Sequence, residues 1–274
     1  MFEFAKYTGA GNDFVVAMAD ERSDRCGAQL ARRVCDRRTG VGTDGLILVY
    51  PRSGGVRVRF FNPDGSEFST CGNGSRCAAR FASDEGIGDP AGFVVETPAG
   101  EIRTKVAGDT VSLQYRIDVA LRGPFVVEVP DGPTRAWLVR IGVPHLVLPL
   151  ERLPDGPIEE ICRPLRRLES LGQDGANVNL VALNDRRSGR VRTFERGVEA
   201  ETLACGSGSM ASVFALRAAG ESEERVTLQV RSGEELEIAI LDPRAPDGSP
   251  RDVRLSGPAI RLFEGSFSDS VFGS

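Results

Sequence analysis

The stretch Thr70-Cys71-Gly72-Asn73-Gly74-Ser75 has a near copy later in the chain, Ala204-Cys205-Gly206-Ser207-Gly208-Ser209. In each copy a cysteine is followed by a glycine, a small polar residue and a second glycine, and then by an apolar helical pattern. A glutamate stands four residues before each cysteine, at Glu67 and Glu201. A duplicated unit with one thiol per copy predicts two thiols on opposite sides of one cleft. Stereochemical inversion of a carbon needs two acid/base groups arranged in that way.

Two weaker echoes accompany the cysteine motifs. The segment Gly11–Val16 is echoed by Gly142–Val147, and Gly42–Ile47 is loosely echoed by Gly172–Asn177. Glycine-rich turns produce single echoes by coincidence, but three echoes in the same order favour an internal repeat. We therefore expect two similar halves.

Length and composition exclude several classes of protein. A chain of 274 residues is long enough for two domains that each bury a core. The hydrophobic fraction of 41% and the charged fraction of 27% are typical of globular proteins, and no apolar run is long enough to span a membrane. Met1–Lys6 lacks a basic segment followed by an apolar core, so no signal peptide is expected. A net charge of −5 argues against nucleic acid as a partner. We expect a cytoplasmic protein with no membrane and no nucleic-acid partner.

Lysine and histidine are scarce. Lys6 and Lys105 are the only lysines, and each lies in a strand-like pattern with no phosphate-binding loop beside it. A pyridoxal enzyme needs a lysine for its Schiff base, so this cofactor is not expected. His145 is the only histidine, which argues against a multi-histidine metal site and against a serine–histidine hydrolase. The sequence predicts no metal and no cofactor.

The six cysteines fall into two groups. None forms a C-x-x-C pair, so zinc ribbons and thioredoxin-type motifs are weak interpretations, and reduced thiols are expected. Cys71 and Cys205 precede predicted helix starts, where backbone N–H groups and the helix dipole lower a thiol's pKa and hold a carboxylate. The others are predicted to be small, buried and inert: Cys26, Cys35, Cys77 and Cys162.

Short strand-like runs outnumber helical patterns. The runs are bounded by turn signals such as Pro63-Asp64-Gly65. Strands are predicted at 14–18, 45–49, 57–61, 93–97, 102–106, 110–115, 125–129, 135–141, 178–183, 190–194, 226–231, 235–241 and 253–256. Helices are predicted at 25–36, 75–84, 158–171 and 209–219. Each half is thus expected to hold many strands and two helices, the second of which follows the cysteine loop.

Five motifs give the chain a family resemblance. In order and spacing it resembles the diaminopimelate epimerase family over almost its whole length. The motifs are Gly9–Phe14, Phe61–Glu67, Cys71–Cys77, Glu195–Gly197 and Glu201–Gly208. The two cysteine motifs together with Glu195-Arg196-Gly197 are the specific ones.

The resemblance implies an α+β fold of two pseudo-symmetric domains, each a strand-rich, barrel-like sheet wrapped around a central helix. It places the first half at 1–118, with 262–274 expected to return to it, and the second at 119–261. It also implies a cytoplasmic homodimer that uses no cofactor and acts on a small amino-acid substrate.

The resemblance also assigns residues by position. Cys71 and Cys205 match the two catalytic thiols, and His145 and Glu195 match the residues that assist them. The loops whose backbone amides hold the reacting α-carboxylate are matched by Gly72, Asn73, Gly206 and Ser207. Substrate contacts are matched by Asn12, Asn62, Asn177 and Arg196, and the last three grip the far end of the substrate.

The chemistry agrees with this assignment. The α-proton of an amino acid is very weakly acidic, so without pyridoxal the carbanion must be stabilised by helix dipoles and by hydrogen bonds to the carboxylate. One thiolate removes the proton and the opposite thiol delivers another to the other face. The expected reaction is the conversion of LL- to meso-diaminopimelate, for lysine and peptidoglycan precursors.

Three departures from the family pattern lie close to these positions. Val143 stands where the family usually has asparagine, Gly45 where glutamine is common, and Val198-Glu199-Ala200 carries one residue more than usual. A related racemase that acts on a different side chain therefore stays open.

Two other classes also stay open. A phenazine-biosynthesis-type isomerase has the same architecture but lacks the paired cysteines. A thiol redox or binding protein would use a Cys71–Cys205 disulfide, and solvent deuterium exchange at an amino acid's α-carbon separates that class from an epimerase.

Overall fold

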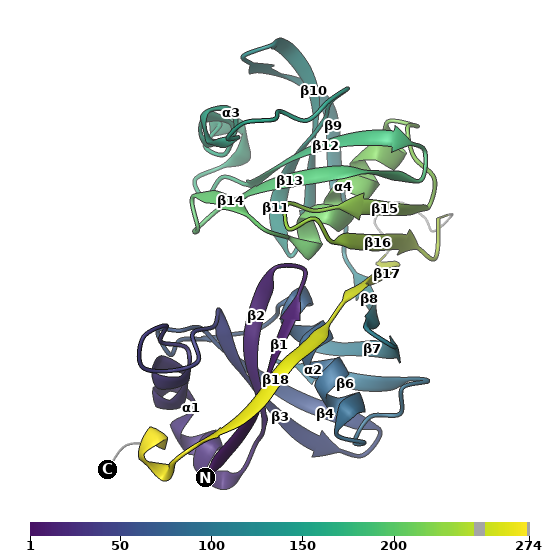
Figure 1. Ribbon diagram of the computed structural model, residues 1–274. Coiled ribbons are helices and arrows are strands. Elements are labelled where there is room, and N and C mark those ends of the chain that lie inside the picture. The colour runs from purple at the N-terminus through teal and green to yellow at the C-terminus, as the bar shows by residue number, and fades with distance from the viewer. Residues whose placement is uncertain (244–249, 273–274) are drawn as a thin grey trace. The chain divides into compact units, whose positions relative to one another are not determined.

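The computed structural model describes residues 1–243 and 250–272 as a mixed α/β, strand-rich protein with four α-helices in that part of the chain (Figure 1). The chain divides into two compact units. Unit 1 comprises Met1–Gln114 and Ser256–Ser274, and unit 2 comprises Tyr115–Leu255. The sequence-based domains, 1–118 with 262–274 and 119–261, have boundaries a few residues away and stay a prediction.

Unit 1 is built on a run of short paired strands. In this unit β1 pairs with β18 and β2, β2 pairs parallel with β3, and β3 pairs antiparallel with β4. Strand β4 also pairs antiparallel with β5 and parallel with β6. Strand β6 pairs antiparallel with β7, and β7 pairs antiparallel with β8. The strands are β1 (Phe2–Gly9), β2 (Asn12–Met18), β3 (Gly45–Arg52), β4 (Gly55–Phe61), β5 (Glu67–Phe68), β6 (Phe93–Thr97), β7 (Gly100–Ala107), β8 (Thr110–Ile117) and β18 (Ile260–Phe267).

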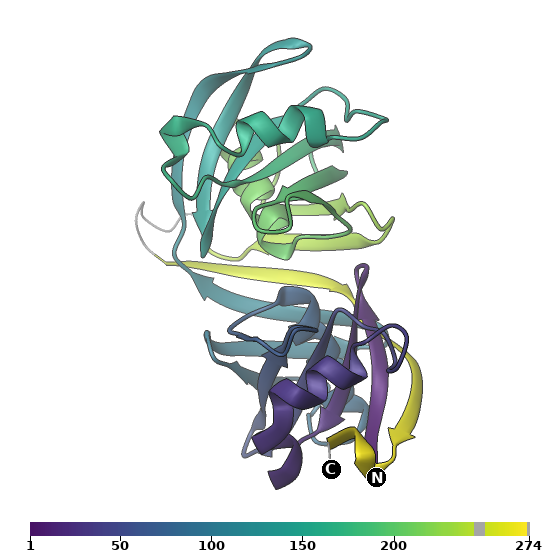
Figure 2. The ribbon, with the colours of Figure 1, turned by 90° about the vertical axis from the view of Figure 1, so that its left-hand side faces the viewer.

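Two helices cover opposite faces of these strands. Helix α1 (Glu21–Val34) begins at Asp20 with a capping box and packs on β3 and β4 beside the short η2 (Asp269–Phe272). Helix α2 (Gly72–Asp84) contacts β1, β2, β3, β4, β6, β7 and β18, and almost all of it is buried. Because strand side chains alternate between faces, Leu46 and Leu48 pack in the α1 core while Ile47 reaches α2. Figure 2 shows α1 against the sheet of unit 1.

Unit 2 has the same kinds of element. Its helix α4 (Gly206–Ala218) contacts β10, β11, β12, β13 and β16, while α3 (Glu159–Leu165) and η1 (Glu169–Leu171) pack on a separate core. The strands are β9 (Ala120–Val129), β10 (Gly132–Ile141), β11 (Val143–Pro149), β12 (Asn177–Asp185), β13 (Ser188–Glu195), β14 (Ala200–Thr202), β15 (Arg225–Gln229), β16 (Glu235–Ile240) and β17 (Arg251–Pro258), the last of which runs on into unit 1.

Strand pairing follows one pattern in both units. The parallel pair β2–β3 and the antiparallel pair β3–β4 correspond to β11–β12 and β12–β13. Likewise β4–β5 and parallel β4–β6 correspond to β13–β14 and parallel β13–β15. The register places Ile47 opposite Phe60 in unit 1, and Asn179 opposite Thr193 at the corresponding point of unit 2.

The observed elements adjust several predictions. Helices α2 and α4 begin three residues earlier than predicted, because the cysteines are N-caps and the glycines after them are already helical. The predicted helix 158–171 is interrupted after Leu165, and strands β5, β11, β14 and β18 were not predicted. The echo of Gly42–Ile47 is shifted, since Gly45 corresponds in register to Asn177 and not to Gly175. No helix within 1–243 or 250–272 is long and apolar enough to cross a membrane.

Candidate active site

Cys71 caps the N-terminus of α2. Its backbone is extended (φ −153°, ψ 118°), and its Sγ accepts a hydrogen bond from the Gly74 N–H at 3.3 Å. The first turn of the helix, which begins with Gly72 and Asn73, leaves backbone N–H groups without partners inside the helix. A helix N-terminus of this kind is suited to bind a carboxylate.

Cys205 caps α4 in the same way. Its Sγ accepts from the Gly208 N–H at 3.4 Å, and the Ser207 hydroxyl lies 3.5 Å from the sulfur. Gly206 and Ser207 form the start of the helix, as Gly72 and Asn73 do in α2. Both duplicated motifs therefore present a thiol at the start of a buried helix, as the sequence predicted.

The glutamate before each cysteine forms an arginine pair in both units. Glu67 binds Arg59 through both carboxylate oxygens at 2.9 Å, and Glu201 binds Arg192 at 2.7 and 2.6 Å. Each pair joins the strand before the cysteine (β5 or β14) to its neighbour (β4 or β13). The two glutamates thus hold the short strand before each helix against its neighbour, and their carboxylates bind arginines and not the thiols.

A polar network in unit 1 holds two of the predicted substrate residues. The Asn73 amide donates to Asn12 Oδ1 at 2.7 Å, and the Asn12 amide donates to Asp44 at 3.0 Å. Buried Arg76 donates to Asn73 Oδ1 at 2.8 Å. Asn12 and Asn73 are thus brought together beside the start of α2. Asn62 is held elsewhere, in the β4–β5 turn, where its amide donates to Ser66 at 2.9 Å.

Glu195 also forms a hydrogen bond with the Cys205 thiol. The same carboxylate accepts from the Thr202 hydroxyl at 2.6 Å. Burial raises the pKa of Glu195, so that its carboxylate is a stronger proton acceptor than an exposed one. Glu195 is therefore the carboxylate placed to take the proton of Cys205.

The sequence-based expectation of a low pKa is wrong for Cys205 in this structure. Burial, followed by the charge of Glu195, raises the pKa of this thiol to about 12. The hydrogen bonds from Ser207 and Gly208 lower it, but by less. Cys205 is therefore a neutral thiol at pH 7, and it needs a base to become a nucleophile or a proton acceptor.

His145 lies on β11 and is fully buried. Its Nδ1 is 3.3 Å from the side-chain nitrogen of Asn179. Burial, with the positive charge of Arg196 as a smaller cause, lowers the pKa of His145 to about 4. The imidazole is therefore neutral at pH 7.

Asn177 and Arg196 meet at the end of the same strands. The backbone N–H of Arg196 donates to Asn177 Oδ1 at 2.8 Å, and the guanidinium of Arg196 lies 3.8 Å from Asp174. Asn177 is also the register partner of His145. Unit 2 thus gathers His145, Asn177 and Arg196 in one group, and Cys205, Ser207 and Glu195 in another.

Sequence analysis missed four residues that support these groups: Asp44, Arg76, Asn179 and Thr202. Each acts through another side chain; Arg76 and Thr202 lie within the two cysteine motifs, and the spacing of Asn179 also offered a signal. It stands two residues after Asn177, which places both on one face of a strand.

The chain matches a protein-family model described as diaminopimelate epimerase over residues 4–121 and 137–248. It is 36% identical to the diaminopimelate epimerase of Hydrogenobaculum sp. (strain Y04AAS1), covering 97% of this chain and 99% of that protein. Identity is also 36% to that of Aquifex aeolicus (98% and 99% covered) and 37% to that of Moorella thermoacetica (96% and 98% covered).

Solved structures of other proteins share the fold. A phenazine biosynthesis protein of the PhzF family from Bacillus anthracis superposes with a TM-score of 0.71 at 14% identity, covering 97% of this chain and 99% of that one. A hydroxyproline epimerase from Agrobacterium vitis, with trans-4-hydroxy-L-proline bound, gives 0.66 at 15% identity, covering 99% and 94%. At these identities the likeness shows the fold alone.

Proposed function

Because this chain belongs to the diaminopimelate epimerase family, a family of isomerases of lysine biosynthesis, we propose that it converts LL- into meso-diaminopimelate with two thiols and no cofactor. The observation that carries the proposal is the repeated arrangement of Cys71 and Cys205, each at the N-terminus of a buried helix. Thiols in these places serve as acid and base, and the helix starts beside them bind the substrate's carboxylate.

Glu195 prepares the second thiol for the reaction. It accepts the proton of the Cys205 thiol, and the resulting thiolate keeps the hydrogen bonds from Gly208 and Ser207. Because burial raises the pKa of Cys205 to about 12, the proton stays on the thiol in the resting pair and moves to Glu195 only during the reaction.

Inversion follows from one proton leaving and another arriving on the opposite side. One thiolate takes the α-proton, and the other thiol delivers its own proton to the opposite face of the carbanion. The negative charge on the carboxylate is met by the backbone N–H groups of Gly72, Asn73, Gly206 and Ser207, at the positive ends of α2 and α4.

The far end of the substrate meets the polar residues outside the two helix starts. Asn62, Asn177 and Arg196 are proposed to bind it, and Asn12 is proposed to contact the substrate from beside Asn73. Arg196 supplies a positive charge for the distal carboxylate.

Two departures from the family pattern have local structural reasons. A Cβ at position 45 would lie 2.8 Å from the Phe61 carbonyl oxygen and 3.3 Å from the Phe14 ring, so Gly45 leaves no room for a glutamine. In the enlarged loop, Glu199 adopts a positive φ of 59° and its carboxylate binds Arg166 at 2.6 Å. This loop follows Gly197, one residue after Arg196, and is the proposed source of compensation for Val143.

Proton exchange at the α-carbon tests this function. Purified protein is incubated with LL-diaminopimelate in heavy water, and α-deuterium and the meso isomer are followed together. We expect both to appear. Exchange into a different amino acid from a panel, with none into diaminopimelate, would instead identify a racemase of another specificity. No exchange into any amino acid would leave a redox or binding protein.

We also infer a duplicated fold, in which each domain is a barrel-like sheet wrapped around α2 or α4, working in the cytoplasm, where thiols stay reduced. The matched strand pairings of the two units support the duplication.

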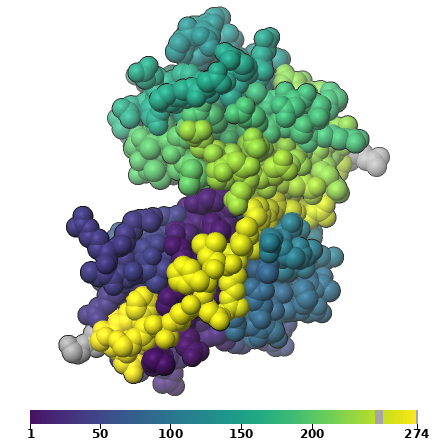
Figure 3. Space-filling view, in the orientation of Figure 1, coloured from purple at the N-terminus to yellow at the C-terminus, as the bar shows by residue number. Residues whose placement is uncertain are grey.

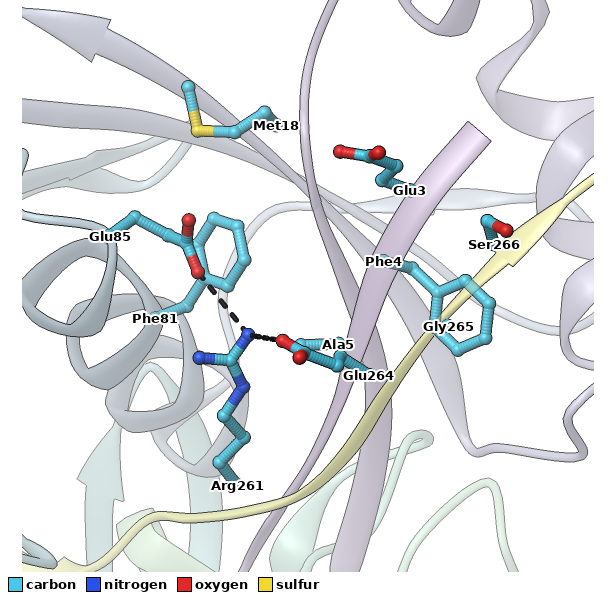
Figure 4. A pocket seen from close by; sticks show the side chains of 10 residues that line it. All are labelled: Glu3, Phe4, Ala5, Met18, Phe81, Glu85, Arg261, Glu264, Gly265 and Ser266. Carbon is cyan, nitrogen blue, oxygen red and sulfur yellow. Dashed lines mark hydrogen bonds and ion pairs between the residues drawn. The ribbon is translucent and has the colours of Figure 1, made fainter. Parts of the chain in front are cut away.

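We propose further that the protein is a homodimer. Large apolar side chains are exposed on unit 1, where Met18 is 39%, Leu262 50% and Phe263 49% exposed. Leu262 and Phe263 lie on β18, and Met18, at the end of β2, lines a hollow of about 430 Å³ in which Arg261 bridges Glu85 and Glu264 (Figures 3 and 4). Sedimentation should give a dimer for the wild type and monomers for Phe263→Glu, and a wild-type monomer would end this proposal.

A further inference from the structure

The duplication supplies an internal comparison for the surroundings of each thiol helix. In α2, a Cβ on Gly74 would touch Phe60 at 3.1 Å and Ile47 at 3.4 Å, so an apolar pair packs against this helix. At the corresponding positions of unit 2, Asn179 and Thr193 face Gly208 of α4. A Cβ on Gly208 would lie 2.2 Å from Asn179 Oδ1. Unit 1 therefore shows that the scaffold packs without polar groups at these positions.

Burying a polar pair is costly unless all its hydrogen bonds are made. Asn179 is fully buried and Thr193 is 4% exposed. Asn179 Oδ1 accepts from the Thr193 hydroxyl at 3.0 Å, and its nitrogen donates to the Leu146 carbonyl at 3.5 Å. Since a backbone carbonyl only accepts, the amide nitrogen must be on the side of Leu146, and this fixes the orientation of the whole side chain.

The orientation of Asn179 decides where the proton of His145 resides. The amide nitrogen that faces Leu146 also lies 3.3 Å from His145 Nδ1. An amide N–H can only donate, so Nδ1 accepts and carries no proton. The proton of the neutral ring is therefore on Nε2, which is buried and makes no hydrogen bond within residues 1–243 and 250–272.

We propose that Asn179, oriented by Thr193, is a positioning residue that holds His145 in the Nε2–H tautomer, so that the ring offers a hydrogen-bond donor and not a base. The acceptor is an anionic group, either a thiolate formed during the reaction or the substrate's carboxylate as it takes up the charge of the carbanion. The two residues that assist the thiols then have different roles: Glu195 accepts a proton, and His145 donates a hydrogen bond. The tautomer follows from the contacts, whereas its use in catalysis rests on the proposed function.

The tautomer is measured directly because the chain has one histidine. Protein labelled with ¹⁵N-histidine, purified without a histidine tag, gives ring signals from His145 alone in two-bond ¹H–¹⁵N spectra. At pH 7 we expect a protonated Nε2 and an unprotonated Nδ1. An Nδ1–H ring, or two tautomers in exchange, would overturn the proposal whether or not the protein acts on diaminopimelate.

Asn179→Asp tests the cause of the tautomer. A carboxylate cannot donate, so it attracts a proton to Nδ1, and the spectrum should change to a protonated Nδ1. The control is Asn184→Asp, which makes the same chemical change at an exposed position on the same strand. A wild-type spectrum in Asn179→Asp would contradict the proposal. If that variant does not fold, Thr193→Val replaces it. Loss of the Thr193 hydrogen bond lets the Asn179 amide rotate, so His145 should show a mixture of tautomers. An unchanged spectrum of Thr193→Val would also contradict the proposal.

Kinetics of α-proton exchange test the catalytic use. General acid–base groups contribute about 10²–10⁴-fold, so a misplaced ring proton should lower kcat by about tenfold to a hundredfold while KM stays within about threefold. Asn184→Asp should match the wild type. A changed tautomer with an unchanged kcat would refute the catalytic part of the proposal, and an inactive wild type with the expected tautomer would refute the proposed function instead.

Discussion

Units 1 and 2 present the same thiol at the same place but surround it differently. Cys71 and Cys205 are both N-caps, and their helices rest on strands paired in the same order. At the position that His145 occupies in unit 2, unit 1 has Phe14, and at the position of Glu195 it has Asn62. The duplicated scaffold thus accounts for the two thiols and the helix starts beside them, while the residues proposed to assist the thiols, His145 and Glu195, belong to unit 2.

The arginine–glutamate pair before each cysteine is more deeply buried in unit 2 than in unit 1. In unit 1 the side chains of Arg59 and Glu67 are 27% and 38% exposed, whereas those of Arg192 and Glu201 are 6% and 11% exposed. Deeper burial weakens the influence of solvent on charges, and it is the main cause of the raised pKa of Cys205 and the lowered pKa of His145. The corresponding ion pairs of the two units therefore differ in burial although their geometry is shared.

The largest expected effect is the loss of either thiol. Cys71→Ser and Cys205→Ser should each abolish net inversion, because each thiol serves one face of the α-carbon. Formation of the meso isomer is the assay, and circular dichroism checks that the fold is intact. Full racemisation by either variant would contradict a mechanism with two bases.

The next effect separates the two units. Glu195→Gln keeps the shape but removes the proton acceptor of Cys205, so kcat should fall by about a hundredfold or more. Asn62→Ala, at the corresponding position of unit 1, should raise KM and change kcat by less than about tenfold. Similar losses of kcat in both variants would remove the proposed asymmetry.

His145 should make the stability of the protein depend on pH. Its pKa is about 4 in the folded protein and 6.5 ordinarily, so the unfolded chain binds this proton more readily. Stability from the buried neutral ring is therefore complete above pH 6.5 and lost as the pH falls toward 4, by about 3 kcal/mol in total.

Urea unfolding at pH 7.5 and pH 4.5 measures this loss. His145→Gln lacks the titrating ring and serves as the reference, so other groups cancel in the comparison. Equal losses of stability in the two proteins would show that His145 is not held neutral by burial.

The smallest expected effect is at Val143, which is 36% exposed on β11. With compensation from the Val198-Glu199-Ala200 loop, Val143→Asn should change kcat/KM for LL-diaminopimelate by less than about tenfold, or 1.4 kcal/mol. A larger gain would indicate that the wild type prefers a different side chain.

The sequence predicted what local patterns encode. A cysteine followed by glycines and an apolar helix predicts an N-capped helix, and both copies are helices of that kind. Strand β11 escaped prediction because Val143-Pro144 interrupts the alternation expected of a strand. The pKa of Cys205 was also not predicted, because it depends on burial and on the charge of Glu195, which the local motif does not reveal.

The role of Asn179 could not be predicted from the sequence, because it depends on residues of neighbouring strands. An asparagine within an apolar strand is ambiguous from sequence alone, because its partners Leu146 and Thr193 lie on neighbouring strands. Only the register of β11, β12 and β13 brings them together, and only the comparison with Ile47 and Phe60 in unit 1 shows that a polar residue is not needed for packing.

The central claim is that the two duplicated thiols act on one carbon, and mild oxidation tests it most directly. Thiols that flank a single atom are close enough to join when diamide removes their two electrons and two protons. Peptide mapping should find a Cys71–Cys205 disulfide in the inactivated enzyme, and a reductant should restore activity. Oxidised, inactive protein in which these two cysteines are not joined to each other would contradict the claim.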